Sequence, residues 1–293
     1  MTKKVFISLI LLLCFVRYFL AQQDTLNKNR LKLVVGTEVV GYAGVMTGLY
    51  SLWFADYPSS GFHSLNDNSS WQQMDKVGHC MTSYYVGMAS YEALRWSGVK
   101  KNKAIGFGGT LGLFFLTSVE ILDGYSAEWG ASWGDVGANA TGTFFFIGQE
   151  MLWDEQRILL KFSFHTTKYD ELSPNFLGEN LSQNIIKDYN GQTYWASVNI
   201  ASFLSEQTKF PKWMNVAFGY GADGMTGTIE NLSHPEIIRY RQYYVSLDID
   251  LTRIKTKSKL ANTLLGAFGF VKFPLPTVEF NSLGKTKFYG VYF

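Results

Sequence analysis

The chain has 293 residues, of which 47% are hydrophobic, 16% aromatic and only 17% charged, and its formal net charge at pH 7 is +2. A soluble domain typically carries about 25% charged residues, so this composition favours a protein at a membrane or its surface. The small net charge and the lack of a long basic run argue against a nucleic-acid binder. The length fits one large domain or two of ordinary size.

The first residues have the features of an export signal. Two lysines precede an apolar run that only Arg17 interrupts, and an Ala-Gln step leads into polar sequence. We therefore predict a signal peptide over residues 1–21, with a retained membrane anchor as the alternative, because Phe19 is not the small residue preferred there. Cys14 follows three leucines, so lipid attachment is not expected. After cleavage Cys80 is the only cysteine, which excludes an intramolecular disulfide.

Four apolar segments with short polar connections follow, over residues 31–54, 74–96, 104–123 and 135–153. The first is long enough to cross a bilayer, but Lys32, Glu38 and several glycines suit a buried helix equally well. The GFGGTLG stretch and the small residues from Gly137 to Gly142 would let helix backbones approach closely. We predict a four-helix bundle with small-residue packing over residues 30–155.

After about residue 155 the pattern becomes alternating. In RYRQYYVSLDIDLTRI, residues 239–254, apolar side chains point one way and mostly polar ones the other, which predicts an amphipathic strand. Weaker strand candidates lie at 159–165, 193–204, 214–221 and the C-terminal end. The sequence thus predicts an α+β protein with an antiparallel β-rich region over residues 156–293. About five or six strands fall short of the eight of a bacterial outer-membrane barrel, which is kept as an alternative.

Polar residues gather near the ends of the predicted helices. Asp75, His79 and Ser83 are one turn apart on the second helix, and Asp135 and Asn139 are one turn apart on the fourth. If these two helices are neighbours, the polar side chains share one buried network. The full set of candidate site residues is Asp75, Lys76, His79, Ser83, Glu120, Asp123, Ser132, Asp135 and Asn139.

Three interpretations of this set compete. In the first the residues are structural, because charges inside a bundle must be paired to avoid a cost of several kcal/mol each. In the second, His79 with Asp75, Asp123 or Asp135 holds a divalent metal, although no known metal motif is present and we predict no cofactor. In the third, His79 is a general base for Ser83 or Ser132. We favour the first, because no convincing nucleophile stands out.

The order DKxxH, an acidic helix end and then S-W-x-D-x-x-x-N-x-x-G resembles the YfiM-like family of predicted periplasmic lipoproteins, and more distantly the VanZ-like membrane proteins. The matching positions are Asp75, Lys76, His79, Ser132, Trp133, Asp135, Asn139 and Gly142. Similarity to the Bacteroidota branch extends over about residues 30–293, through DYNGQTYW, KFPKWMNVAFGYGADGM and YRQYYVSLDIDLTRIKTKSK to the terminal FYGVYF.

The resemblance implies an exported envelope protein of unknown activity, and the VanZ-like relatives imply some connection with glycopeptide tolerance. We expect a structural or interaction role in the periplasm, associated with a membrane, with the outer membrane favoured. The expected partner is a membrane surface or an envelope protein. The alternative is a hydrolase or transferase that acts on a lipid-linked or cell-wall precursor.

Overall fold

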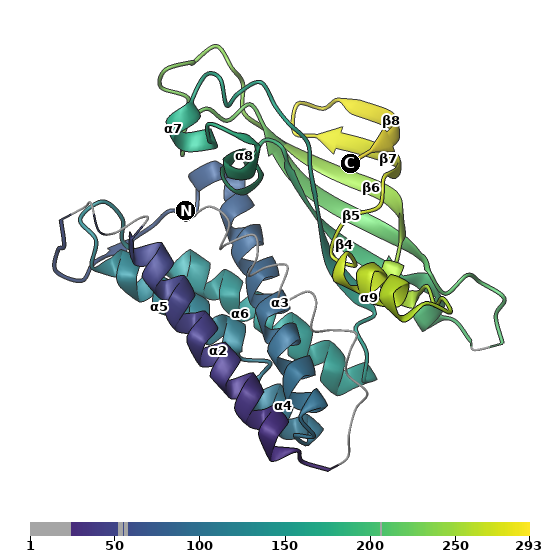
Figure 1. The fold of residues 1–293 in the computed structure, drawn as a ribbon. Coiled ribbons are helices and arrows are strands. Elements are labelled where there is room, and N and C mark those ends of the chain that lie inside the picture. Colours follow the sequence, from purple (N-terminus) through teal and green to yellow (C-terminus); the bar gives the residue numbers. More distant parts are fainter. Residues whose placement is uncertain (1–24, 52–54, 56–57, 206) are drawn as a thin grey trace. The chain divides into compact units, whose positions relative to one another are not determined.

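The computed structural model describes residues 25–51, 55, 58–205 and 207–293 (Figure 1). The predicted signal peptide and residues 52–54 of the first apolar segment lie outside these ranges. Helices together with an antiparallel sheet make this an α+β protein, as predicted. The chain divides into two compact units. The first combines the chain up to Asn68 with His79–Glu155, and the second combines Ser69–Gly78 with Gln156–Phe293.

The first unit is mostly helical. It contains α2 (Lys28–Leu49), α3 (Met74–Trp96) from His79 onward, α4 (Lys101–Phe107), α5 (Leu111–Gly124) and α6 (Trp133–Trp153), with a short parallel pair β1 (Ser64–Leu65) and β2 (Ala131–Ser132). The third apolar segment is divided into α4 and α5 around Gly108, where a β-carbon would collide with the backbone of Tyr91. Among the described residues, the stretch Lys101–Gly124 has the length and hydropathy of a membrane-crossing helix.

Two glycines bring α5 and α6 into backbone contact with α3. A β-carbon on Gly142 of α6 would collide with the carbonyl oxygen of Cys80, and one on Gly112 of α5 with that of Ser83. Gly137, also on α6, has nothing within 4 Å of an added β-carbon. Of the small residues that the sequence singled out, Gly142 therefore sets the closest approach of α6 to α3.

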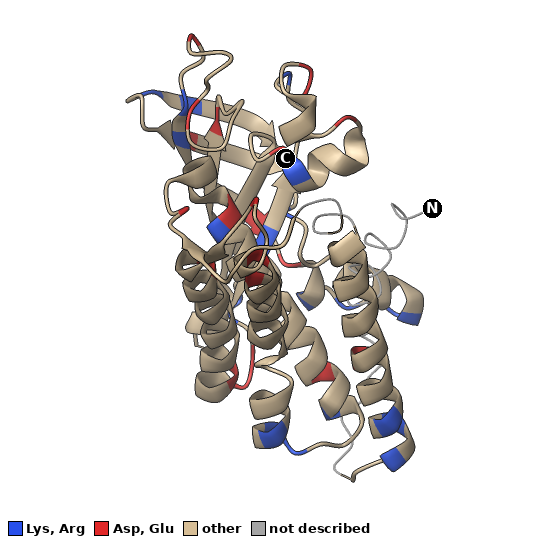
Figure 2. Cartoon of the chain, turned by 90° about the vertical axis from the view of Figure 1, so that its left-hand side faces the viewer, with Lys and Arg blue, Asp and Glu red and all other residues tan. Residues whose placement is uncertain are grey.

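The two ends of these helices differ in charge (Figure 2). The start of α2 lies beside the end of α3, since Asn27 N donates to Ser97 O at 2.8 Å and Arg30 Nη1 to Trp96 O at 3.4 Å. Basic residues gather at this end: Lys28, Arg30, Lys32, Lys100, Lys101 and Lys103. Glu120 near the end of α5 and Asp135 at the start of α6 lie at the other end. The candidate site thus occupies the acidic end of the helices.

The second unit is built on a six-stranded antiparallel sheet in which every strand pairs with its neighbour in sequence. The strands are β3 (Ile158–Phe164), β4 (Gln192–Asn199), β5 (Met214–Asp223), β6 (Tyr240–Ile249), β7 (Leu275–Asn281) and β8 (Thr286–Tyr292). Helices α7 (Pro174–Leu177), α8 (Leu181–Lys187) and α9 (Lys259–Ala267) and the 3-10 turns η3 (Ser70–Gln73), η4 (Ile200–Phe203) and η5 (Leu251–Arg253) complete the unit.

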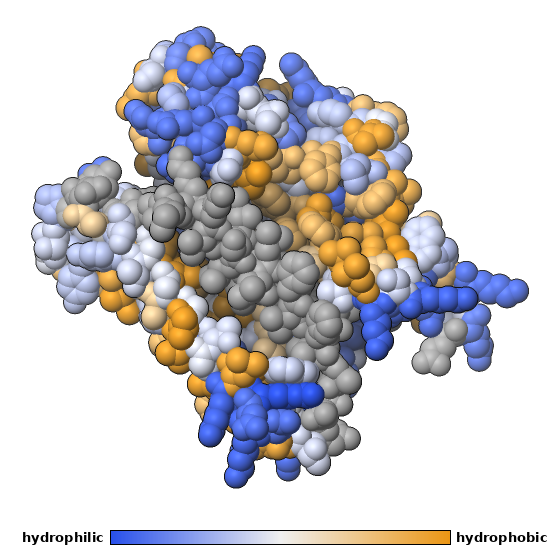
Figure 3. All heavy atoms as spheres, in the orientation of Figure 1, coloured by the Kyte–Doolittle hydropathy of each residue, from blue (hydrophilic) through white to orange (hydrophobic). Residues whose placement is uncertain are grey.

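The alternation predicted for β6 is present, but its polar face is the buried one. Tyr244, Ser246 and Asp248 are buried, whereas Val245 and Leu247 are exposed. Figure 3 shows hydrophobic side chains on the surface over the strands. A sheet in a soluble protein normally buries its apolar face, so this sheet has the opposite arrangement.

A buried ion cluster ties the polar face together. Lys161 Nζ of β3 lies 2.7 Å from Asp248 Oδ2 of β6, and Lys272 Nζ, just beyond α9, lies 3.7 Å from Asp248 Oδ1. All three side chains are fully buried. Burial lowers the pKa of Lys272 to about 8, against the opposing effect of Asp248. The two ammonium groups also donate to main-chain carbonyls, among them Ile249 O and Leu247 O, so the cluster joins β3, β6 and the segment after α9.

We predict that Gly142→Ala lowers the free energy of unfolding by about 1–3 kcal/mol, because the new methyl group overpacks the contact with α3. The matched control is Gly137→Ala on the same helix, which should be neutral or stabilise by up to about 1 kcal/mol, since alanine is the better helix former. Urea unfolding followed by far-UV circular dichroism measures both. Equal effects of the two substitutions would contradict the assigned contact.

Asp248→Asn should destabilise the protein by about 3–5 kcal/mol, because it leaves two buried ammonium groups without a carboxylate. Glu236→Gln is the control, since the Glu236 side chain is 69% exposed and its removal should change stability by no more than about 0.5 kcal/mol. Both are measured by urea denaturation. If Asp248→Asn lowers the free energy of unfolding by less than about 1 kcal/mol, the ion cluster does not stabilise the fold as proposed.

Candidate functional site

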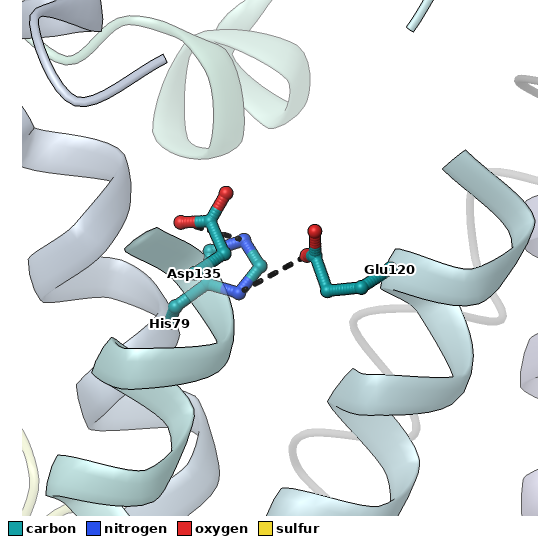
Figure 4. A group of neighbouring side chains, drawn as sticks. All are labelled: His79, Glu120 and Asp135. Carbon is teal, nitrogen blue, oxygen red and sulfur yellow. Dashed lines mark ion pairs between the residues drawn. The ribbon is translucent and has the colours of Figure 1, made fainter. Parts of the chain in front are cut away.

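The site is centred on His79 of α3, which two carboxyl groups approach from other helices (Figure 4). His79 Nδ1 lies 3.1 Å from Asn139 Oδ1 of α6 and 4.0 Å from Glu120 Oε1 of α5. His79 Nε2 lies 3.9 Å from Asp135 Oδ1 of α6. The structure therefore brings together four of the residues that the sequence singled out, from three helices.

These groups differ in their access to solvent. Asn139 is fully buried, Glu120 is 4% exposed and Asp135 is 6% exposed, whereas the His79 side chain is 26% exposed. The imidazole is thus the part of the site that solvent reaches most readily.

Ser132 links the residues around the imidazole. Its side chain caps α6 by accepting from Asp135 N at 3.1 Å, its main-chain N–H donates to Glu120 Oε2 at 2.9 Å, and its hydroxyl donates to Asp67 Oδ1 at 2.5 Å. Asp67 was not among the predicted residues. It lies in a polar loop rich in Asp, Asn and Ser, where no periodicity distinguishes it from its neighbours.

The candidate nucleophiles have other roles. The Ser132 hydroxyl is engaged by Asp67, and the buried Ser83 hydroxyl lies 2.8 Å from Thr143 Oγ1 between α3 and α6. Burial raises the pKa of the Cys80 thiol to about 11, so it is not a thiolate at neutral pH. None of these three groups is arranged as an activated nucleophile.

Two acids of the site titrate near neutrality. Burial raises the pKa of Glu120 to about 7, and the Asp135 carboxylate adds to the rise while the Ser132 N–H opposes it. Burial also raises the pKa of Asp123 to about 7, with further contributions from Asp135 and Asp67. Crowded, buried carboxyl groups disfavour each other's charge. The site can therefore hold protons, or an added cation, at physiological pH.

Asp75 and Lys76 lie in the first turn of α3, in the part of that helix that belongs to the second unit. Lys76 Nζ is 2.9 Å from Asp75 Oδ2. Within that unit, burial raises the pKa of Tyr194 and the Asp75 charge raises it further. The sequence predicts that these two residues share one buried cluster with His79, and this stays a prediction.

Comparison with known families supports a place in the cell envelope. Residues 63–147 match the model of a family described as "Predicted periplasmic lipoprotein (DUF2279)". No curated protein matches the chain. No solved structure matches it either. The matched segment contains His79, Glu120, Asp135 and Asn139, while the Bacteroidota branch and the VanZ-like similarity stay predictions.

Stability should fall between about pH 4 and pH 7, because in this range the folded state retains protons that the unfolded state has lost. The pKa of Asp123 is about 7 in the folded protein against an ordinary 3.8, so its stabilising contribution is complete below about pH 3.8 and disappears as the pH rises through 7.

Asp123→Asn should reduce this fall by up to about 2 kcal/mol between pH 5 and pH 7, since each retained proton contributes about 1.4 kcal/mol per pH unit. Urea unfolding across this range, with EDTA to remove divalent cations, gives the measurement. An unchanged pH profile in Asp123→Asn would show that this carboxyl group does not retain its proton.

Proposed function

We propose that this chain is an exported envelope protein with a structural or interaction role at a membrane in the periplasm, with the outer membrane favoured. The family match over residues 63–147 supports the envelope. The observation that carries the membrane association is the exposed apolar face of the sheet, because a surface of this kind is normally covered by a partner or a lipid phase.

The apolar face is continuous across four strands. Phe218 of β5 pairs with Val245 of β6, which pairs in turn with Val278 of β7, and Val278 pairs with Phe288 of β8. Phe218 is 53% exposed and Phe288 is 72% exposed. Aromatic and aliphatic side chains in such a row suit contact with acyl chains and the interface around them.

Basic loops lie at one end of the same sheet. The register pairs Met214 with Ile249, so the loop before β5 and the segment after β6 lie at the same end. These segments carry exposed Lys209, Lys212, Lys255, Lys257 and Lys259. Each basic residue near an anionic bilayer surface contributes about 1 kcal/mol of attraction. The exposed apolar face of the sheet and the lysines at one end of it together favour an anionic lipid surface as the partner.

In this proposal α2, α3, α5 and α6 form the four-helix bundle expected from the sequence, and the polar site fixes their packing. The glycine contacts to Cys80 and Ser83 support close helix packing. The lack of an activated nucleophile among Ser83, Ser132 and Cys80 supports a non-catalytic role.

One observation favours the enzyme alternative. Glu120, whose pKa is about 7, lies beside a partly exposed imidazole, and a general acid or base works best when its pKa is near the working pH. The second candidate is therefore a hydrolase or transferase that acts on a lipid-linked or cell-wall precursor.

The membrane proposal predicts that purified protein sediments with vesicles that contain phosphatidylglycerol, and that Val245→Asn combined with Phe288→Asn lowers this binding at least tenfold. The control is Phe176→Asn on α7, which is 56% exposed but lies off the sheet, and it should bind as the wild type does. Complete release of the wild type in soluble form on osmotic shock would contradict membrane association.

The substitution His79→Gln distinguishes a structural role of the polar site from a catalytic one. In a deletion strain we expect this variant to be depleted by degradation, because it weakens the junction of three helices. Protein abundance and envelope integrity are measured together. A variant that is as abundant and as well folded as the wild type but has lost all function would favour the enzyme instead.

A further inference from the structure

We propose that His79, Glu120 and Asp135 bind a divalent transition-metal ion such as Zn²⁺ or Mn²⁺. Each residue offers one donor atom, and the three donor atoms lie within 4.8 Å of one another. One imidazole and two carboxylates form a mixed nitrogen and oxygen ligand set, which suits these ions better than Ca²⁺ or Mg²⁺, whose protein ligands are oxygen atoms. The inference goes beyond the proposed membrane role and does not depend on it.

The distances are those of donors around an ion rather than of groups bonded to each other. His79 Nε2 and Asp135 Oδ1 are 3.9 Å apart, which is too far for a hydrogen bond. Metal–ligand bonds of about 2.0–2.2 Å place two donors about 3.4 Å apart in a tetrahedral site, and at most about 4.2 Å apart on opposite sides of the ion. Asp135 Oδ1 already lies within this range of Nε2, and because the three donor atoms lie within 4.8 Å of one another, side-chain movements of about 1 Å would complete the site.

Asn139 fixes the imidazole in the form that a metal requires. The carbonyl oxygen of its side chain lies 3.1 Å from His79 Nδ1 and can accept the Nδ1–H. This leaves the lone pair on Nε2, the nitrogen that faces Asp135. Metal-binding histidines usually donate their second N–H to a carbonyl or carboxylate in this way.

A second feature of Asn139 points to a ligand. The residue is fully buried, and its Nδ2 makes no hydrogen bond within the part of the chain that the structure describes. A buried donor without an acceptor is uncommon in native proteins. An oxygen atom of a metal-bound water would supply this acceptor beside His79.

Ser132 holds one of the proposed ligands in place. Its N–H donates to Glu120 Oε2, which leaves Glu120 Oε1 as the oxygen that faces the imidazole, 4.0 Å from its Nδ1. Its side chain also caps the turn that carries Asp135. Supporting contacts of this kind orient ligands before the ion binds.

The test uses the full chain purified in detergent, stripped with chelator and titrated with Zn²⁺ or Mn²⁺. We expect one equivalent to bind, with an affinity at least tenfold above that for Mg²⁺ or Ca²⁺. The nearly isosteric variants Glu120→Gln and Asp135→Asn, together with His79→Gln, should each weaken binding more than 100-fold. Asn139→Ala should weaken it by about 10–100-fold, as expected when a supporting residue is lost.

The matched controls are His234→Gln and Glu236→Gln. These residues form another imidazole–carboxylate pair, 3.3 Å apart, with the carboxylate side chain largely exposed, and their removal should change the affinity by less than twofold. Circular dichroism of each metal-free variant checks the fold. The visible absorption of bound Co²⁺, which should change on His79→Gln, reports the imidazole directly.

Failure of the wild type to bind either ion would overturn the proposal. So would binding that survives Glu120→Gln and Asp135→Asn in folded protein, or that is lost equally in the two controls. Because vesicle binding through the sheet involves none of these residues, loss of the metal site and loss of membrane association are measured separately.

Discussion

The contact of α3 with α5 and α6 through Gly112 and Gly142 is the constraint on which the first unit depends. Backbones that touch at these two glycines leave no space for larger side chains, so the groups one turn away are forced together. His79 is one residue from Cys80, whose carbonyl meets Gly142, and Asn139 lies almost one turn before Gly142. Close packing at the glycines thus brings the polar groups together, and the contacts of these groups in turn join the three helices.

The same packing explains the chemistry of the site. The carboxyl groups of Glu120 and Asp135 that face the imidazole of α3 are largely removed from water. Burial is also the main reason that the pKa values of Glu120 and of Asp123, one turn further along α5, rise. A buried carboxylate is stable only when it is protonated, paired with an ammonium group or bound to a metal ion. Close approach of backbones therefore produces a site with an affinity for cations.

The second unit is stabilised by a different kind of interior. Its sheet has a polar interior that contains Lys161, Asp248 and Lys272, and an exterior rich in aromatic and aliphatic residues. Ions inside a sheet are stable only when they are paired and hydrogen-bonded. Here main-chain carbonyls and one carboxylate meet that need.

Much of the fold could be predicted from the sequence. The periodicity of residues 74–96 and 135–153 matches α3 and α6 closely, and the alternation within residues 239–254 identifies β6. The direction in which β6 faces could not be predicted, because alternation gives two faces without saying which is buried. On the buried face Asp248 pairs with Lys161 and Lys272, which are far from it in sequence.

The candidate site was predictable to a similar extent. One-turn spacing identified His79 and Asn139, and the acidic end of a helix identified Glu120, but nothing in the loop sequence distinguished Asp67. The break between α4 and α5 was also missed, because the apolar run continues through it.

The boundary between the two units falls inside α3, and this limits how the chain can be divided. Met74, at the start of α3, is fully buried in a cluster with Ala222 and Met225 of the second unit, while the same helix continues into the first unit. A fragment that starts after residue 155 would lack this piece of its own core. A fragment that ends there would carry Met74 without its partners. The two units are therefore distinct in packing but cannot be separated by a single cut of the chain.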